Sequence, residues 1–160
     1  TLTGAINSCL KAAGEKKWKQ TKGKMADLEA YFAAASKEKG KKVNIVIDSK
    51  EAAEAYERGK KEYYSQRGYL KLSCASCHVQ GAGQRVRNEY MSPLFGQTTH
   101  FPVYRLKWEG LGTLERRLKG CNKDQGENPH KPGSKWMNEV SYFMAYMSNG
   151  LPVDGPDIRK

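Results

Sequence analysis

The chain has 160 residues, a formal net charge of +11 and a mean hydropathy of −0.79. This length allows one ordinary hydrophobic core or two small ones, and no apolar run reaches the length of a membrane-spanning helix. Residues 1–42 hold ten lysines and four acidic residues, which are expected on a solvated face. Because aromatic–basic interleaving typical of nucleic-acid binding is absent, we expect this charge to attract an acidic protein partner.

The first 70 residues show two helical patterns separated by an extended segment. The apolar face of the first helix carries Met25, Leu28, Tyr31, Phe32 and Ala35. The β-branched run 43–47 predicts a short extended linker. Ser49 is the expected N-cap of a second helix. Tyr56, Gly59 and Tyr63 recur along it at helical spacing, which continues to Gly68.

The segment Cys74-Ala75-Ser76-Cys77-His78 follows that helix directly. C-x-x-C-H is the attachment signature of c-type haem: each thiol can form a thioether to one vinyl group, and His78 supplies the proximal imidazole. A zinc knuckle would need a second closely spaced ligand pair, which the sequence lacks. A thioredoxin-like redox pair would need a strand-rich setting, which is also absent. The motif therefore predicts one covalent haem.

Residues 113–150 predict two helices joined by a polar loop. The first helix is expected to end at Lys119-Gly120, so that Cys121 opens the loop over 122–133. Ser134 is the expected N-cap of the second helix, which should stop at Asn149-Gly150. Apolar residues recur at helical spacing along it: Met137, Val140, Phe143, Met144 and Met147.

The segments 1–36 and 113–148 align without a gap at a constant offset of 112 residues, with ten identities. The identities include the isolated cysteines Cys9 and Cys121. The alignment predicts a mainly α fold built from a duplicated cytochrome c-like unit. Residues 1–44 would form a partial, haem-less copy containing only the back half, and residues 45–160 the complete haem domain. Either the first copy's front half lies upstream of Thr1, where we also expect a leader, or the fold tolerates a remnant.

Several residues could ligate the haem iron opposite His78. Candidates are Cys121, Met91, His100 and His130, together with the methionines at 137, 144 and 147, whose helical stripe is more typical of a core. A free cysteine in an oxidising compartment needs a partner or a function. For Cys121 the alternative to iron ligation is a disulfide with Cys9.

Five segments resemble the SoxA subunits of the SoxAX cytochromes in the thiosulfate-oxidising Sox system: Gly68–His78 with the haem motif, Phe101–Trp108, Leu114–Cys121, Ser148–Pro152 and Pro156–Lys160. The resemblance covers essentially the whole chain. It implies an L-cysteine S-thiosulfotransferase whose haem c is ligated by His78 and by Cys121, a cysteine often found as a persulfide in this family. It also implies that Arg117 lies in the substrate site. A single C-x-x-C-H indicates the one-haem kind, with Cys9 as the relic of a former haem ligand.

The implied reaction couples thiosulfate oxidatively to a cysteine of a SoxY-like carrier protein, and a SoxX-like cytochrome receives the electrons. Because haem c is attached outside the cytoplasmic membrane in bacteria, we expect a periplasmic protein. Arg105, Lys107 and Lys135 are further candidates for anion contact, with surface charge or structural pairing as the alternative for each. The competing functions are a plain electron-transfer cytochrome c and a sensor of diatomic gases. Neither needs Cys121 beside Arg117.

Overall fold

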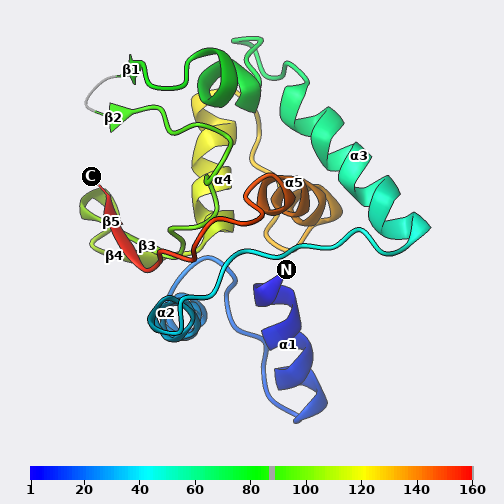
Figure 1. Ribbon diagram of the computed structural model, residues 1–160, viewed down its shortest axis with the longest axis vertical. Coiled ribbons are helices and arrows are strands. Elements are labelled where there is room, and N and C mark those ends of the chain that lie inside the picture. The colour runs from blue at the N-terminus through cyan, green and yellow to red at the C-terminus, as the bar shows by residue number, and fades with distance from the viewer. Residues whose placement is uncertain (87–88, 160) are drawn as a thin grey trace.

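The computed structural model describes residues 1–86 and 89–159, and the predicted mainly helical cytochrome c-like fold is confirmed (Figure 1). The long helices are α1 (Leu2–Ala12), α2 (Lys24–Glu38), α3 (Lys50–Tyr64), α4 (Leu114–Asp124) and α5 (Lys135–Tyr146). Two short helical turns are η1 (Ser76–Gln80), a π-turn, and η2 (Leu106–Trp108), a 3₁₀ turn.

The strands are two or three residues long and form two small sheets. Strands β1 (Arg85–Val86) and β2 (Glu89–Tyr90) pair as an antiparallel hairpin. In the other sheet, β3 (Val103–Arg105) lies between β4 (Gly110–Gly112) and β5 (Asp157–Arg159). Strand β3 runs antiparallel to β4 and parallel to β5, which places Arg105 opposite Arg159. The last strand of the chain, β5, thus forms one edge of this sheet, beside α4 (Figure 1).

The main core lies where α3 crosses α5. It contains Tyr63 from α3, and Met137, Val140, Phe143 and Met144 from the apolar stripe predicted on α5. The helices approach closely because Gly59 has no side chain: a Cβ there would lie 2.1 Å from the Glu139 carbonyl oxygen. The predicted N-caps are also confirmed, since Ser49 accepts from the Ala52 amide and Ser134 from the Met137 amide.

The prediction that a helix ends at Lys119-Gly120 is wrong, because α4 continues through Gly120 to Asp124. The stop signal is Gly126, which has a φ of +77°. The Gly126 amide donates to the Lys123 carbonyl, and the Glu127 amide donates to the Asn122 carbonyl. This Schellman arrangement requires a left-handed residue at its centre. Cys121 therefore lies inside a helix rather than at the start of a loop.

Helix α1 has the same construction as α4. Each has a threonine N-cap, Thr1 or Thr113, whose hydroxyl accepts from the amide three residues on. The bounds of the two helices differ by the same 112 residues as the aligned sequence segments. Helix α1 likewise ends at a left-handed glycine, Gly14, with a φ of +76°. This correspondence supports the duplication, which stays a prediction together with its division at residue 44.

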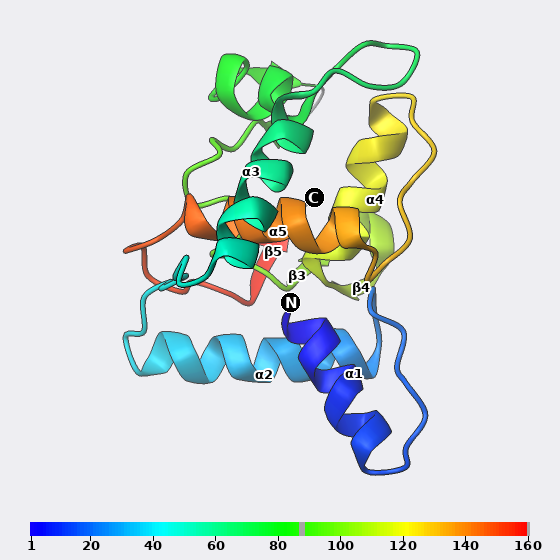
Figure 2. The ribbon, with the colours of Figure 1, turned by 90° about the vertical axis from the view of Figure 1, so that its right-hand side faces the viewer.

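Helices α1 and α2 lie together below the rest of the molecule in Figure 2. On α2, Met25, Ala26 and Ala33 are buried, whereas Tyr31 and Phe32 are 68% and 43% exposed. Tyr31 and Phe32 therefore do not share the burial of Met25, although the sequence predicted one apolar face for all three.

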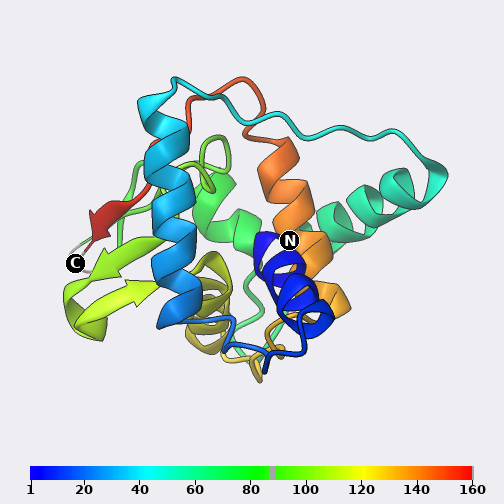
Figure 3. The same cartoon turned by 90° about the horizontal axis from the view of Figure 1, so that it is seen from below.

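The predicted linker over residues 43–47 forms no regular strand and runs extended beside residues 149–153 (Figure 3). The amide of Val43 donates to the Leu151 carbonyl, and the amide of Ile45 donates to the Asn149 side chain. These contacts fasten the linker to the end of the haem domain. Within the described residues, no helix is both long and apolar enough to cross a membrane.

Adding one methyl group at Gly59 should weaken the α3–α5 crossing. Gly59→Ala places a Cβ against the backbone of Glu139, so the helices must separate. We expect a loss of about 1–3 kcal/mol in the free energy of unfolding, measured by urea denaturation of the haem-loaded protein. The matched control is Gly120→Ala in α4, where an added Cβ meets only the end of the Arg117 side chain. This substitution should raise the free energy of unfolding by about 1 kcal/mol at most. Equal effects of the two substitutions would contradict this account of the crossing.

Glu29 on α2 should make stability depend on pH. Burial, followed by the neighbouring carboxylate of Glu115, raises the pKa of Glu29 to about 7. The Glu29 carboxyl therefore holds its proton more tightly in the folded state than in the unfolded state. Its contribution to the free energy of unfolding is favourable at low pH and is lost as pH rises through 7. Glu29→Gln should stabilise the protein at pH 8 and change little at pH 4.5, by urea unfolding at both pH values. The exposed Glu38→Gln on the same helix controls for charge removal, and a pH-independent effect of Glu29→Gln would refute the assignment.

Candidate haem site

A cavity of about 630 Å³ opens between the C-x-x-C-H segment, α4 and the three-stranded sheet. His78, Arg117 and Cys121 line it, as do Met91 and His100. The fold thus brings the main site residues predicted from the sequence into one cavity, although they come from segments up to 43 residues apart. His130, Met137 and Met147 do not line this cavity, so its geometry favours Cys121, Met91, His100 or Met144 opposite His78.

The Cys74–His78 segment is a compact turn held by its own serines. The Ser73 amide donates to the Ser76 hydroxyl, and the Ser76 amide donates to the Ser73 hydroxyl, at 3.1 and 3.0 Å. Cys77 and His78 then lie in the π-turn η1, a conformation often found at functional sites. These two reciprocal hydrogen bonds hold the backbone that carries the two thiols and the imidazole. Covalent attachment of haem needs this spacing.

His78 is oriented by the backbone of Ser92. Its Nδ1 lies 2.7 Å from the Ser92 carbonyl oxygen, so Nδ1 carries the proton and donates. The Nε2 atom then carries no proton, so its lone pair can coordinate a metal, as in most metal-binding histidines. Burial, with a smaller effect of the Arg117 charge, lowers the pKa of His78, whereas the Ser92 bond raises it. The neutral ring is therefore favoured. Nothing in the sequence pointed to Ser92.

Cys121 sits on the cavity side of α4, and its thiol is subject to opposing influences. Burial raises its pKa, and Asp124 and Cys77 act in the same direction. The guanidinium groups of Arg117 and Arg105 lower it. A thiolate is the form that ligates a metal and acts as a nucleophile. The two arginines are thus the groups of the chain that favour the reactive form.

The two neighbouring arginines on α4 have different surroundings. Arg117 lines the cavity, and its Nη1 lies 3.8 Å from the exposed carboxylate of Asp124. Arg116 points elsewhere: its guanidinium packs over the Trp108 ring at 4.3 Å, and its Nη1 donates to the Leu111 carbonyl. This separation is what the 100° step between successive helical residues produces.

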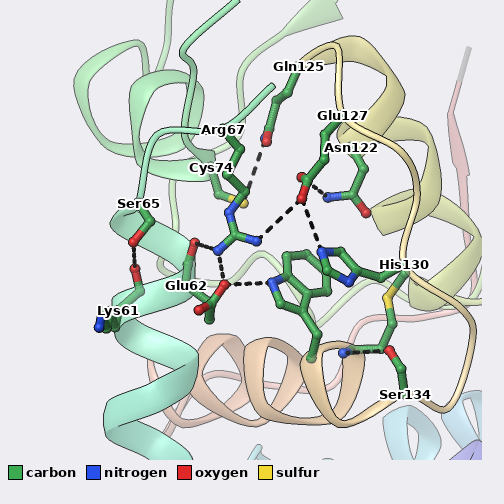
Figure 4. Close-up of polar contacts among 12 residues, drawn as sticks. Lys61, Glu62, Ser65, Arg67, Cys74, Asn122, Gln125, Glu127, His130 and Ser134 are labelled. Carbon is green, nitrogen blue, oxygen red and sulfur yellow. Dashed lines mark hydrogen bonds and ion pairs between the residues drawn. The ribbon is translucent and has the colours of Figure 1, made fainter. Parts of the chain in front are cut away.

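A polar cluster joins the loop after α4 to the end of α3 and to the segment that precedes the C-x-x-C-H motif (Figure 4). Arg67 donates to Glu62 and pairs with Glu127, which also contacts His130 at 3.1 Å. The ring of His130 stacks on Trp136 with centroids 4.1 Å apart. His130 is therefore part of this structural cluster, which sequence reasoning missed because its members are up to 74 residues apart.

The far end of α4 reaches Cys74 itself. Gln125 Nε2 lies 3.8 Å from the Cys74 sulfur (Figure 4). Gly68 lies so close to the end of α4 that a Cβ there would be 2.3 Å from the Gln125 carbonyl oxygen. Helix α4 therefore runs from the sheet at its N-terminal end to the C-x-x-C-H loop at its C-terminal end (Figures 1 and 2).

The structure gives little support to the disulfide, the zinc knuckle and the lysine anion contacts that the sequence left open. All four cysteines are free, Cys9 is exposed, and the Cys9–Cys121 disulfide is therefore wrong. No group of three or more His, Cys, Asp or Glu side chains within the described residues could hold a metal ion, so a zinc knuckle lacks its ligands. Of the two other anion candidates, neither Lys107 nor Lys135 lines the cavity.

Comparison with known proteins identifies the family. The model of the SoxA/TsdA cytochrome c domain matches residues 58–153. The chain belongs to this family. The matched region runs from α3 through α5 and contains the whole C-x-x-C-H segment together with Cys121. The resemblance inferred from the sequence is thereby confirmed, except that Lys160, the last residue of its closing segment, lies outside the described residues.

Several proteins are similar over the whole chain. The L-cysteine S-thiosulfotransferase subunit SoxA of Chlorobaculum tepidum is 46% identical over 160 residues, and that of Allochromatium vinosum 43% identical. The crystal structure of SoxXA from P. pantotrophus matches 99% of this chain with a TM-score of 0.89 and 35% identity. The chain spans 55–57% of the length of these two curated relatives and 58% of the solved chain.

A cytochrome c domain implies covalently bound haem c, and the residues of the cavity fit that group. The imidazole of His78, with a protonated Nδ1, lines the cavity, and a cysteine sulfur on α4 is among the other lining residues. The Cys74 and Cys77 thiols belong to the same segment as His78, next to the cavity lining. The Nε of Arg105, also on the cavity wall, is buried without a hydrogen-bond partner in the described structure. Cys74 and Cys77 would hold the macrocycle, and the iron would lie between His78 and a residue facing it.

Proposed function

We propose that this chain is the haem-binding part of a SoxA-type L-cysteine S-thiosulfotransferase, which oxidatively couples thiosulfate to a cysteine of a SoxY-like carrier protein. The observation that carries the proposal is that Arg117 and Cys121 lie one turn apart on α4 and line the same cavity as His78. A plain electron-transfer cytochrome needs neither a cysteine nor an arginine there. The names of the curated relatives support the proposed activity.

Cys74 and Cys77 would hold one covalent haem, and His78 and Cys121 would ligate its iron. The Ser92 carbonyl holds the imidazole in the required tautomer. Arg117 and Arg105 favour the thiolate of Cys121 against the effect of burial. When bound, the haem supplies the one-electron acceptor that passes electrons to a partner cytochrome.

Thiosulfate is a dianion, and Arg117 offers it a planar donor fork. In the reaction, a sulfur–sulfur bond forms between the sulfane sulfur and the Sγ of the carrier cysteine. The thiol proton of that cysteine is released, and two electrons leave. Arg117 binds the substrate and places its sulfane sulfur near Cys121, so that the attacking cysteine meets an oriented substrate.

The partner cytochrome is a SoxX-like subunit, and the protein acts in the periplasm. The similarity to a crystal structure of SoxXA supports the first statement. Covalent haem attachment, which occurs outside the cytoplasmic membrane, supports the second. The net charge of +11 also favours encounters with acidic partners.

Removing the Arg117 guanidinium should impair thiosulfate turnover. A charge-assisted contact with a bound anion contributes about 1.5–3 kcal/mol, so Arg117→Ala should lower kcat/KM for thiosulfate about ten- to a hundredfold. Arg117→Lys should recover only part, because a point charge lacks the bidentate fork. The assay is electron transfer from thiosulfate and carrier protein to the partner cytochrome, using the full-length haem-loaded protein.

Arg116→Ala is the matched control, since Arg116 is the neighbouring cation on α4 but packs on Trp108 outside the cavity. It should retain full turnover. Normal turnover in Arg117→Ala would show that thiosulfate does not bind at this cavity, and an inactive Arg116→Ala with an active Arg117→Ala would move the site by one residue.

A further inference from the structure

Arg105 is a second arginine on the wall of the haem cavity, contributed by the end of β3. Its side chain is only 11% exposed. Its Nη2 donates to Glu89 Oε1 at 2.6 Å, and its guanidinium packs over the Trp108 ring at 5.3 Å. A carboxylate and an aromatic ring therefore fix its position, so little conformational freedom remains to be lost when it binds a ligand.

One donor of this fixed guanidinium is unused. Arg105 Nε is among the few buried side-chain atoms of the described residues that have no hydrogen-bond partner. Buried donors are normally paired, and an unpaired one on a charged group is costly. Because Nε is closed to solvent while the cavity is open, a ligand in the cavity would meet the Nη atoms of Arg105, which Glu89 and the Trp108 ring hold in place on the cavity wall.

Two cations share this part of the cavity with Cys121. The charge of Arg117, after the larger effect of burial, lowers the pKa of Arg105, while Glu89 and Cys121 act in the opposite direction. The nearest carboxylates are Glu89, already paired, and Asp124, which is 67% exposed and 3.8 Å from Arg117. Two like charges held together in a partly buried site repel unless an anion lies near both.

We propose that Arg105 is the second arginine of the thiosulfate site, and that the sulfonate end of the dianion binds between Arg105 and Arg117 while its sulfane sulfur faces Cys121. This inference rests on the proposed function and deepens it. Two guanidinium groups match the two negative charges, and their planar forks suit the three sulfonate oxygens. Glu89 acts as a positioning residue, because it touches Arg105 rather than the substrate.

The other arginines near the sheet serve as comparisons. Arg159 also lines the cavity, opposite Arg105 in register, but it is 51% exposed and pairs with Asp157 on its own strand. Arg116 packs on the same Trp108 ring as Arg105 but does not line the cavity. Arg116 is thus the closest control, since its removal takes away one positive charge and one ring contact without changing the cavity wall.

The test compares thiosulfate binding by full-length haem-loaded protein carrying Arg105→Ala, Arg105→Lys, Glu89→Gln or Arg116→Ala. The readouts are the thiosulfate dissociation constant, from perturbation of the ferric haem absorbance spectrum, and KM against kcat in turnover. We expect Arg105→Ala to weaken binding about ten- to a hundredfold, Arg105→Lys to recover part of it, and Arg116→Ala to stay within about twofold. Glu89→Gln should raise KM with little change in kcat, because it loosens Arg105 but keeps its charge.

The principal competing ligand for Arg105 is a haem propionate. In that case Arg105→Ala would shift the midpoint potential and its pH dependence while thiosulfate affinity stayed at the wild-type value, and this result would overturn the proposal. Should Arg105→Ala fail to retain haem, Arg105→Lys and Glu89→Gln still decide between the two outcomes. If Arg117→Ala weakens binding and the Arg105 variants do not, the proposed function stands and this inference is wrong. If wild-type protein binds no thiosulfate, both are wrong.

Discussion

The uninterrupted course of α4 through Gly120 is the constraint on which the rest of the site depends. Because the helix continues to Asp124 before the stop at Gly126, it carries Arg117 and Cys121 one turn apart on the cavity wall. Its N-terminal end is fixed at the sheet, and Gln125 at its C-terminal end reaches Cys74 of the C-x-x-C-H segment. A helix that stopped at Gly120 would leave Cys121 on a loop rather than on the wall of the cavity that His78 also lines.

The electrostatics of the cavity follow from this placement. Burial disfavours a charged thiolate at Cys121, and Arg117 and Arg105 on the cavity wall offset that effect. The same guanidinium groups are suited to oxyanions. In the proposed function this pair of cations would serve two purposes: it would favour the ligating form of the cysteine, and it would provide a site for a doubly charged substrate beside it. This double role links Arg105, on a strand far from α4 in sequence, to the chemistry of Cys121.

The sequence predicted those features that local chemistry determines. The C-x-x-C-H spacing indicated haem, the N-caps Ser49 and Ser134 marked two helix starts, and the apolar stripe of α5 identified the core. It misplaced the end of α4, because Gly120 and Gly126 carry equally good stop signals and only packing against the Gly68 loop favours the second. Ser92 and Glu89 could not have been found, since their roles depend on contacts with residues 14 and 16 positions away that no local pattern encodes.

The most direct test of the central claim is low-temperature electron paramagnetic resonance of the oxidised protein, comparing the wild type with Cys121→Met and Cys121→Ala. Thiolate, methionine and imidazole ligands give low-spin haem distinct signatures and different potentials. The account predicts a thiolate-ligated low-spin signal in the wild type, and a His/Met signal with a higher midpoint potential in Cys121→Met. A spectrum of Cys121→Ala identical to that of the wild type would contradict it, because another residue would then hold the iron.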